Sequence, residues 1–161
     1  MIVLAHGLEG RPDGTKATAL RDAGFDVIAP DGRNLALAAR IAGVEAALQG
    51  LNDVILVGSS YGGVVAAVVA NRHRERLRGL VLLAPALVWK EDPVDDPEAV
   101  TIPADLPCIV IHGVHDDIIP VDVSRRLARR SPHVILRERA DDHLLRNSLP
   151  EMIAAVRELG G

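Results

Sequence analysis

The chain has 161 residues, of which 48% are hydrophobic and 25% charged, and its formal net charge is −4. This length allows one hydrophobic core, so we expect residues 1–161 to form a single domain. The acidic balance argues against a nucleic-acid partner, because nucleic-acid binding needs a basic face. With 2% aromatic residues, the chain also lacks the rings on which single-stranded nucleic acids stack.

Two features bear on the compartment. The N-terminal residues Met1–Ala5 lack the charged n-region and long apolar h-region of a signal peptide, and no apolar run is long enough to span a bilayer. Cys108 is the single cysteine, so no intramolecular disulfide can form, and its apolar surroundings predict a buried, unreactive thiol. We expect a cytoplasmic protein with no membrane partner. Its oligomeric state stays open between a monomer and a homodimer.

Short apolar, β-branched runs recur along the chain and predict strands. Each run is apolar almost throughout, which is typical of strands that are covered on both faces. Alternation of such strands with helices predicts an α/β fold, with a doubly wound, mainly parallel six-stranded sheet and helices on both faces. In chain order, the expected strands are Ile2–Ala5, Asp26–Ala29, Asp53–Val57, Gly79–Leu83, Cys108–Ile111 and His133–Leu136.

Helical patterns fill most of the intervals. The first is a stripe of Leu37, Ile41, Val44 and Leu48, for which we expect Asn34 as the N-cap. The others are an Ala- and Val-rich helix over 61–73, a helix that starts near Pro120, and a last helix around Met152, Ile153 and Val156. Residues 85–107 differ, because five prolines and several acidic residues there predict an irregular excursion.

In such sheets, ligands bind beyond the carboxyl ends of the strands. Ser60 stands at one of these ends, in the run Gly58-Ser59-Ser60-Tyr61-Gly62 between a buried strand and a helix. A serine hydroxyl is a poor nucleophile unless a base lies beside it and a tight turn exposes its oxygen. Glycines two residues either side suit such a strained turn. Ser60 is therefore our candidate nucleophile.

A base and an acid are available at two other strand ends. His143 follows the last strand in a polar turn and is the candidate base. Asp116 and Asp117 both follow the fifth strand, and either carboxylate could orient the imidazole of His143. Asp141 and Asp142 are too close to His143 in sequence to reach its far ring nitrogen, and we expect them to shape the turn.

The loop His6-Gly7-Leu8 follows the first strand. We expect the backbone N–H of Leu8, together with that of Tyr61, to bind an oxyanion, because these groups lie where negative charge would form. Gly7 would let the loop approach the substrate closely. For His6 we expect a bracing role within the loop.

His112, His115, Asp116 and Asp117 are close in sequence and raise the question of a metal site. Zinc hydrolases need at least three converging ligands, whereas His112 ends a strand and His115 lies in a turn. We therefore expect no metal and no cofactor.

Taken together, these segments resemble the α/β-hydrolase superfamily, and within it the small lidless bacterial serine esterases. The likeness rests on His6-Gly7, on Gly58–Gly63, on His112-Gly113-Val114-His115-Asp116-Asp117-Ile118-Ile119-Pro120 and on His143. The third segment is similar to the family pattern H-G-x-x-D-x-x-V/I-P, whose aspartate is the triad acid. The resemblance thus implies a triad of Ser60, His143 and Asp116. The family's cap domain is replaced here by the excursion at 85–107, which implies a shallow, open pocket. Trp89 lies in this excursion. It either lines the acyl pocket or anchors the loop.

The resulting hypothesis is a serine carboxylesterase that acts on small-molecule esters with short acyl chains. A thioesterase or an amidase with the same triad is an alternative. So is a non-catalytic binding protein with this fold. A phosphate-binding protein that uses the turn Gly58–Gly63 is disfavoured, because no lysine follows those glycines.

Overall fold

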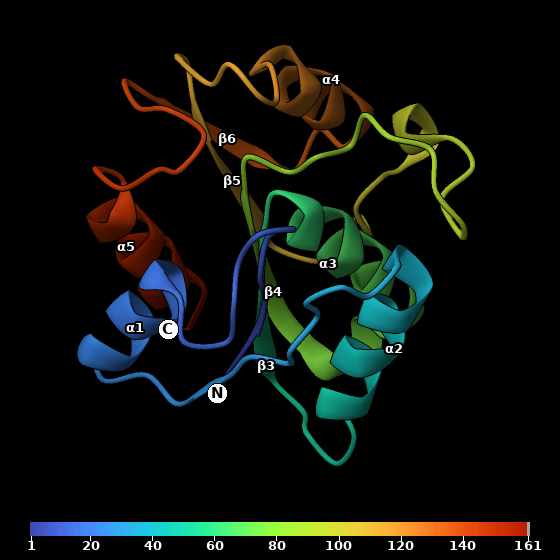
Figure 1. The fold of residues 1–161 in the computed structure, drawn as a ribbon, viewed down its shortest axis with the longest axis vertical. Helices are drawn as coiled ribbons and strands as arrows, with labels where there is room; N and C mark the ends of the chain where they lie inside the picture. The colour runs from blue at the N-terminus through green and yellow to red at the C-terminus, as the bar shows by residue number, and fades with distance from the viewer. Residues whose placement is uncertain (161) are drawn as a thin grey trace.

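The computed structural model describes residues 1–160, and in them a six-stranded sheet forms the centre of the molecule (Figure 1). All strand pairs are parallel, in the spatial order β2-β1-β3-β4-β5-β6. The strands are β1 (Ile2–Ala5), β2 (Val27–Ile28), β3 (Val54–Ser59), β4 (Leu77–Leu83), β5 (Cys108–Gly113) and β6 (Ile135–Arg139). The predicted parallel, doubly wound sheet is confirmed.

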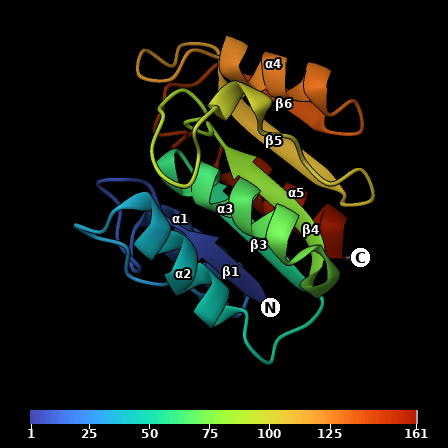
Figure 2. The same cartoon turned by 90° about the vertical axis from the view of Figure 1, so that its right-hand side faces the viewer.

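Helices cover both faces of this sheet (Figure 2). They are α1 (Thr15–Asp22), α2 (Leu37–Ala47), α3 (Tyr61–Arg72), α4 (Asp122–Arg130) and α5 (Leu149–Gly160). Side chains from α2, α3 and α4 form one apolar core with one face of the sheet, and α1 and α5 form a second core on the other face. Burial on both sides explains why the central strands are apolar throughout.

The strand order reverses between β1 and β3. The chain leaves β1 toward β2 on one side and leaves β3 toward β4 on the other, so a topological switch point lies between two adjacent strands. Ala5 pairs with Gly58 in register. The loops after β1 and β3 therefore meet at one level of the carboxyl edge, at the upper left of Figure 2.

The last strand, β6, lies at Ile135–Arg139 and so is shifted from the predicted His133–Leu136. Two details of the helices also differ from the sequence prediction. Asn34 does not cap α2: its φ is 58°, in the left-handed region, and α2 begins three residues later. The first N–H of α2, at Leu37, instead donates to the carboxylate of Glu91. The second difference is α1, which the sequence did not predict because it buries only Ala17 and Leu20 and so shows no long apolar stripe.

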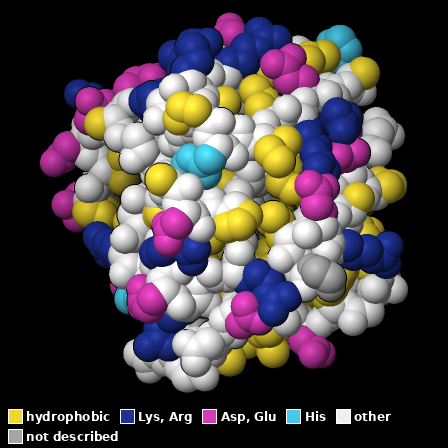
Figure 3. Space-filling model, turned by 180° about the vertical axis from the view of Figure 1, so that it is seen from behind, with side chains coloured by type: hydrophobic (Ala, Val, Ile, Leu, Met, Phe, Trp, Pro, Cys, Tyr) yellow, Lys and Arg dark blue, Asp and Glu magenta, His cyan; other side chains and the backbone are white. Residues whose placement is uncertain are grey.

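The excursion, the cysteine and the surface charge were also predicted from the sequence. Residues 85–107 are irregular apart from a 3₁₀ turn at Pro97–Ala99, as predicted. Cys108 is 2% exposed at the start of β5, and burial raises the pKa of its thiol, so the predicted burial is confirmed. No helix within residues 1–160 is long and apolar enough to cross a membrane. On the face in Figure 3, basic and acidic side chains intermix and form no basic patch.

Candidate active site

Ser60 lies at a strained turn between β3 and α3. Its φ of 53° and ψ of −117° are unusual for a residue with a side chain, and such conformations cost about 1–3 kcal/mol. A Cβ at Gly58 would lie 2.6 Å from Ala66 Cβ, and one at Gly62 would lie 2.0 Å from the carbonyl oxygen of Ala5. The predicted reason for these two glycines is confirmed, since neither position has room for a side chain.

A chain of hydrogen bonds joins Ser60 to a base and an acid. His143 Nε2 lies 2.9 Å from Ser60 Oγ, and His143 Nδ1 lies 2.7 Å from Asp116 Oδ2. A carboxylate only accepts hydrogen bonds, so Nδ1 carries the proton of the neutral ring and Nε2 is the acceptor for the serine O–H. The three side chains come from the ends of β3, β5 and β6.

The structure distinguishes between the two candidate acids. Asp116 has no exposed side-chain surface, and its Oδ1 accepts from the N–H groups of Ile118 and Ile119 at 2.9 and 2.7 Å. These bonds leave Oδ2 directed at His143. Asp117 is exposed and makes no contact with the imidazole in residues 1–160.

Asp141 and Asp142 shape the turn that presents His143, as predicted. Asp141 accepts from the N–H of Asp142 and from the hydroxyl of Ser148, at 2.9 and 2.8 Å. Asp142 accepts from the N–H of Leu144 at 2.8 Å. Both carboxylates therefore fold the turn on itself and leave the base free to contact Asp116.

His112 is fully buried behind the acid. Its Nε2 lies 2.8 Å from the carbonyl oxygen of Ile119 and 3.2 Å from Asp116 Oδ2, and its Nδ1 lies 2.7 Å from Ser124 Oγ. Both neighbours of Nε2 are acceptors, so Nε2 carries the proton and Nδ1 accepts from the hydroxyl of Ser124. Burial lowers the pKa of His112 and favours this neutral form. In the sequence, His112 was considered only as a metal ligand, and its contact with Asp116 was not predicted.

Across residues 1–160, no three His, Cys, Asp or Glu side chains converge in the way that a metal ion requires. His112 is occupied by its own hydrogen bonds, and His115 is exposed. These residues do not form a metal site together.

The loop after β1 passes beside Ser60. A Cβ at Gly7 would lie 3.5 Å from Ser60 Cβ, and Leu8 lines the same groove as Ser60. Within residues 1–160, the N–H groups of Leu8 and Tyr61 donate to no acceptor. His6 Nε2 accepts from the N–H of Gly32 at 3.0 Å, and its Nδ1 donates to the carbonyl of Gly7 at 2.8 Å, which is the expected bracing role.

A groove of about 930 Å³ runs from Ser60 and His143 along the loop after β1 to α1. Trp89 from the excursion lines it and is 47% exposed. The exposed apolar side chains Leu8, Ile118 and Leu144 also line it.

The sequence analysis missed Arg40, which is only 5% exposed. It lies on α2, three residues after Leu37 and four before Val44, within the stripe that packs on the sheet. An arginine in an apolar stripe was the available signal, because arginine is almost never fully buried without partners.

Part of the chain is similar to a described protein family. A model of the serine aminopeptidase family S33 matches residues 37–104. A carbendazim-hydrolysing esterase from a Nocardioides species is 40% identical over 80 residues, which are 42% of this chain and 33% of that enzyme. The chain therefore spans about a third of the length of this relative.

Solved structures match nearly the whole chain. One, of an α/β-superfamily hydrolase from Xanthomonas campestris pv. campestris, has a TM-score of 0.80 and 27% identity, over 98% of this chain and 95% of that one. Est1E from Butyrivibrio proteoclasticus has a TM-score of 0.81 and 19% identity, over 98% and 85% of the two chains. The mouse α/β hydrolase domain-containing protein 10 has a TM-score of 0.83 and 20% identity, over 98% of this chain and 88% of that one. The last two similarities concern the fold alone.

Proposed function

Because this chain is a member of the α/β-hydrolase superfamily, we propose that it is a serine hydrolase that cleaves carboxylic esters through an acyl-enzyme on Ser60. The observation that carries the proposal is the continuous contact from Ser60 Oγ to His143 and from His143 to Asp116, at 2.9 and 2.7 Å. The similarity to an esterase supports ester chemistry.

In the proposed reaction, Ser60 Oγ attacks the ester carbonyl carbon while His143 Nε2 takes the hydroxyl proton. Asp116 holds the imidazole in the required tautomer and stabilises its cation. The N–H groups of Leu8 and Tyr61 donate to the oxyanion of the tetrahedral intermediate. His143 then returns the proton to the departing alcohol, and a water molecule repeats the sequence on the acyl-enzyme to release the acid. These steps need neither a metal nor a cofactor.

For the substrate, we propose a small-molecule ester with a short acyl chain, because no cap covers the site. The groove of about 930 Å³ is in the size range of pockets that hold drug-sized ligands, so it leaves room for a larger alcohol part. Trp89 and Leu8 would contact this part through their exposed apolar surface.

An amidase is the second candidate, and the match of residues 37–104 to a serine aminopeptidase family supports it. The same three side chains would act, with His143 protonating a departing amine instead of an alcohol. Hydrolysis of p-nitroanilides at rates comparable to those of p-nitrophenyl esters would favour the amidase.

The test is an acyl-chain series of p-nitrophenyl esters, from acetyl to dodecanoyl, run on the wild type and on Ser60→Ala and His143→Ala. Loss of a triad member costs about 10⁴–10⁶ in kcat, so we expect both variants to be nearly inactive. A loss of only a few-fold would contradict the triad. A steady rise in rate toward dodecanoyl would contradict the short-chain preference.

A non-catalytic binding protein would behave differently. It would leave Ser60 unreactive, so a fluorophosphonate probe would fail to label the wild type. We expect labelling of the wild type and none of Ser60→Ala.

A further inference from the structure

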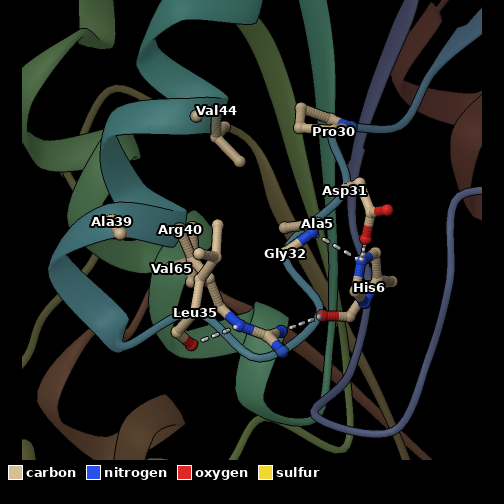
Figure 4. Close-up of a pocket in the computed structure, with 11 residues that line it drawn as sticks. Ala5, His6, Pro30, Asp31, Gly32, Leu35, Ala39, Arg40, Val44 and Val65 are labelled. Carbon is tan, nitrogen blue, oxygen red and sulfur yellow. Dashed lines mark hydrogen bonds and ion pairs between the residues drawn. The ribbon is translucent and has the colours of Figure 1, made fainter.

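Arg40 holds the loop after β1 from behind. From α2, its Nη1 donates to the carbonyl oxygens of His6 and Gly7 at 3.2 and 3.3 Å, and its Nη2 donates to that of Leu8 at 3.2 Å. Its Nε donates to the carbonyl of Leu35 at 3.2 Å. Figure 4 shows the guanidinium between α2 and the backbone of His6, at the border of a small cavity of about 20 Å³. One buried side chain thus binds three successive carbonyls of this loop.

These bonds set the orientation of the peptide between Gly7 and Leu8. The Gly7 carbonyl accepts from Arg40, and also from the N–H of Gly10 at 3.0 Å and from His6 Nδ1 at 2.8 Å. In a planar trans peptide, the C=O and the following N–H point in opposite directions. Holding the Gly7 carbonyl toward Arg40 therefore turns the N–H of Leu8 away from α2. Gly7 and Leu8 both line the groove that contains Ser60.

The same guanidinium contacts the residue that carries the other candidate donor. Arg40 Cζ lies 4.9 Å from the centroid of the Tyr61 ring, within the range of a cation–π contact. The Tyr61 hydroxyl donates to Glu91 Oε2 at 2.5 Å, and Glu91 Oε1 accepts from the first N–H of α2. Burial and the Glu91 carboxylate raise the pKa of Tyr61 to about 12, so this hydroxyl keeps its proton. Tyr61 is therefore contacted at its hydroxyl by Glu91 and on the face of its ring by Arg40.

We propose that Arg40 is a positioning residue for both oxyanion donors, orienting the Leu8 N–H through the Gly7 carbonyl and the Tyr61 N–H through the Tyr61 ring. The proposal rests on the proposed function, because the two donors matter only where an oxyanion forms. Arginine is required because its planar guanidinium spreads five N–H groups over three nitrogens, whereas lysine carries its donors on one atom.

The test compares Arg40→Met and Arg40→Lys with the wild type on p-nitrophenyl acetate, with active sites counted by a fluorophosphonate. Removing one oxyanion donor costs about 10²–10³ in kcat. For Arg40→Met we expect kcat to fall by about 10²-fold while KM stays nearly unchanged, and for Arg40→Lys an intermediate loss. The Ki of a trifluoromethyl ketone, whose bound form carries an oxyanion, should rise in parallel with the fall in kcat/KM.

The matched control is Arg74→Met. Arg74 is also partly buried and donates to two backbone carbonyls, those of Leu77 and Asp105, but it lies beyond the far end of α3. We expect a loss of thermal stability from this variant and no change in kcat or Ki. A structural role alone would make Arg40→Met behave like Arg74→Met, and that result would overturn the inference. If Arg40→Met does not fold, Arg40→Lys carries the same test.

Failure of the proposed function would look different. If Ser60→Ala hydrolysed esters as well as the wild type, the hydrolase proposal would be wrong, whatever Arg40 does. A Ser60-dependent enzyme with wild-type kcat in Arg40→Met would overturn the positioning role alone. The crystal structure of Arg40→Met gives a readout without activity: we expect a displaced Gly7–Leu8 peptide, and an unmoved one contradicts the inference.

Discussion

A buried histidine lies at the carboxyl end of β1 and another at that of β5, but the two are bonded differently. His6 is the first residue after β1, and His112 is the last but one residue of β5. His6 makes its hydrogen bonds to backbone groups, the N–H of Gly32 and the carbonyl of Gly7, and its Nε2 lies 3.9 Å from Asp31 Oδ1. His112 bonds to a carbonyl but also to the side chains of Ser124 and Asp116. The first loop thus presents backbone N–H groups, and the second presents a carboxylate. We therefore expect substitutions that move the backbone to impair the first loop, and substitutions that remove a side chain to impair the second.

The largest expected effect is in the second loop. Asp116→Asn keeps the shape of the acid but replaces the acceptor that selects the Nδ1–H tautomer of His143, so we expect kcat to fall by about 10⁴-fold. The measurement is steady-state hydrolysis of a p-nitrophenyl ester. Asp117→Asn is the control, since Asp117 is exposed, and it should keep wild-type activity. Equal losses in both variants would contradict the assignment of Asp116.

Next comes a substitution in α3 that should displace the backbone of the first loop. In Gly62→Ala the new Cβ would lie 2.0 Å from the carbonyl oxygen of Ala5 and 2.6 Å from that of His6, so β1 and its loop must move away from α3. We expect the free energy of unfolding to fall by about 3 kcal/mol, measured by urea denaturation. Unchanged stability would show that this contact is not as close as the structure places it.

A smaller effect concerns pH. Burial lowers the pKa of His112 from its ordinary value of 6.5, so below pH 6.5 the unfolded chain binds a proton that the folded chain does not. Stability that is present above pH 6.5 is therefore lost as the pH falls, by up to about 1.4 kcal/mol per pH unit. We expect His112→Phe to show a flatter decline than the wild type between pH 7 and pH 5.5 in urea titrations. Parallel curves would contradict a neutral His112.

The smallest effect tests the helix that carries Arg40. Gly43 is inside α2, and a Cβ there would lie no closer than 3.9 Å to another residue, at Pro30 Cβ. Gly43→Ala should stabilise the fold by about 0.5–1 kcal/mol, because alanine is the better helix former. Thermal unfolding measures it, and kcat should be unchanged. A loss of stability would show that α2 lacks the space that the structure gives it.

The same contrast explains what could be predicted from sequence. Ser60, Asp116 and His143 were predictable because each lies within four residues after the end of a strand, and parallel strands bring such positions to one edge. Asn34 was a wrong prediction, since Glu91 supplies the cap of α2 from 54 residues away. Arg40 escaped for the same reason: its acceptors lie 32 to 34 residues away in the loop after β1. Short-range sequence patterns predict where strands end. They do not predict which residues, distant in sequence, form hydrogen bonds with a helix.

Cys108 has a practical consequence of its own. It is the one cysteine of the chain, 2% exposed at the start of β5, where it is paired in register with Leu80 of β4. A maleimide can reach this thiol only when the sheet opens, so the labelling rate in native buffer counts opening events. Cys108 thus reports the rate at which the native fold opens locally. Every variant proposed above can be ranked by that rate, in the absence of denaturant and without a substrate.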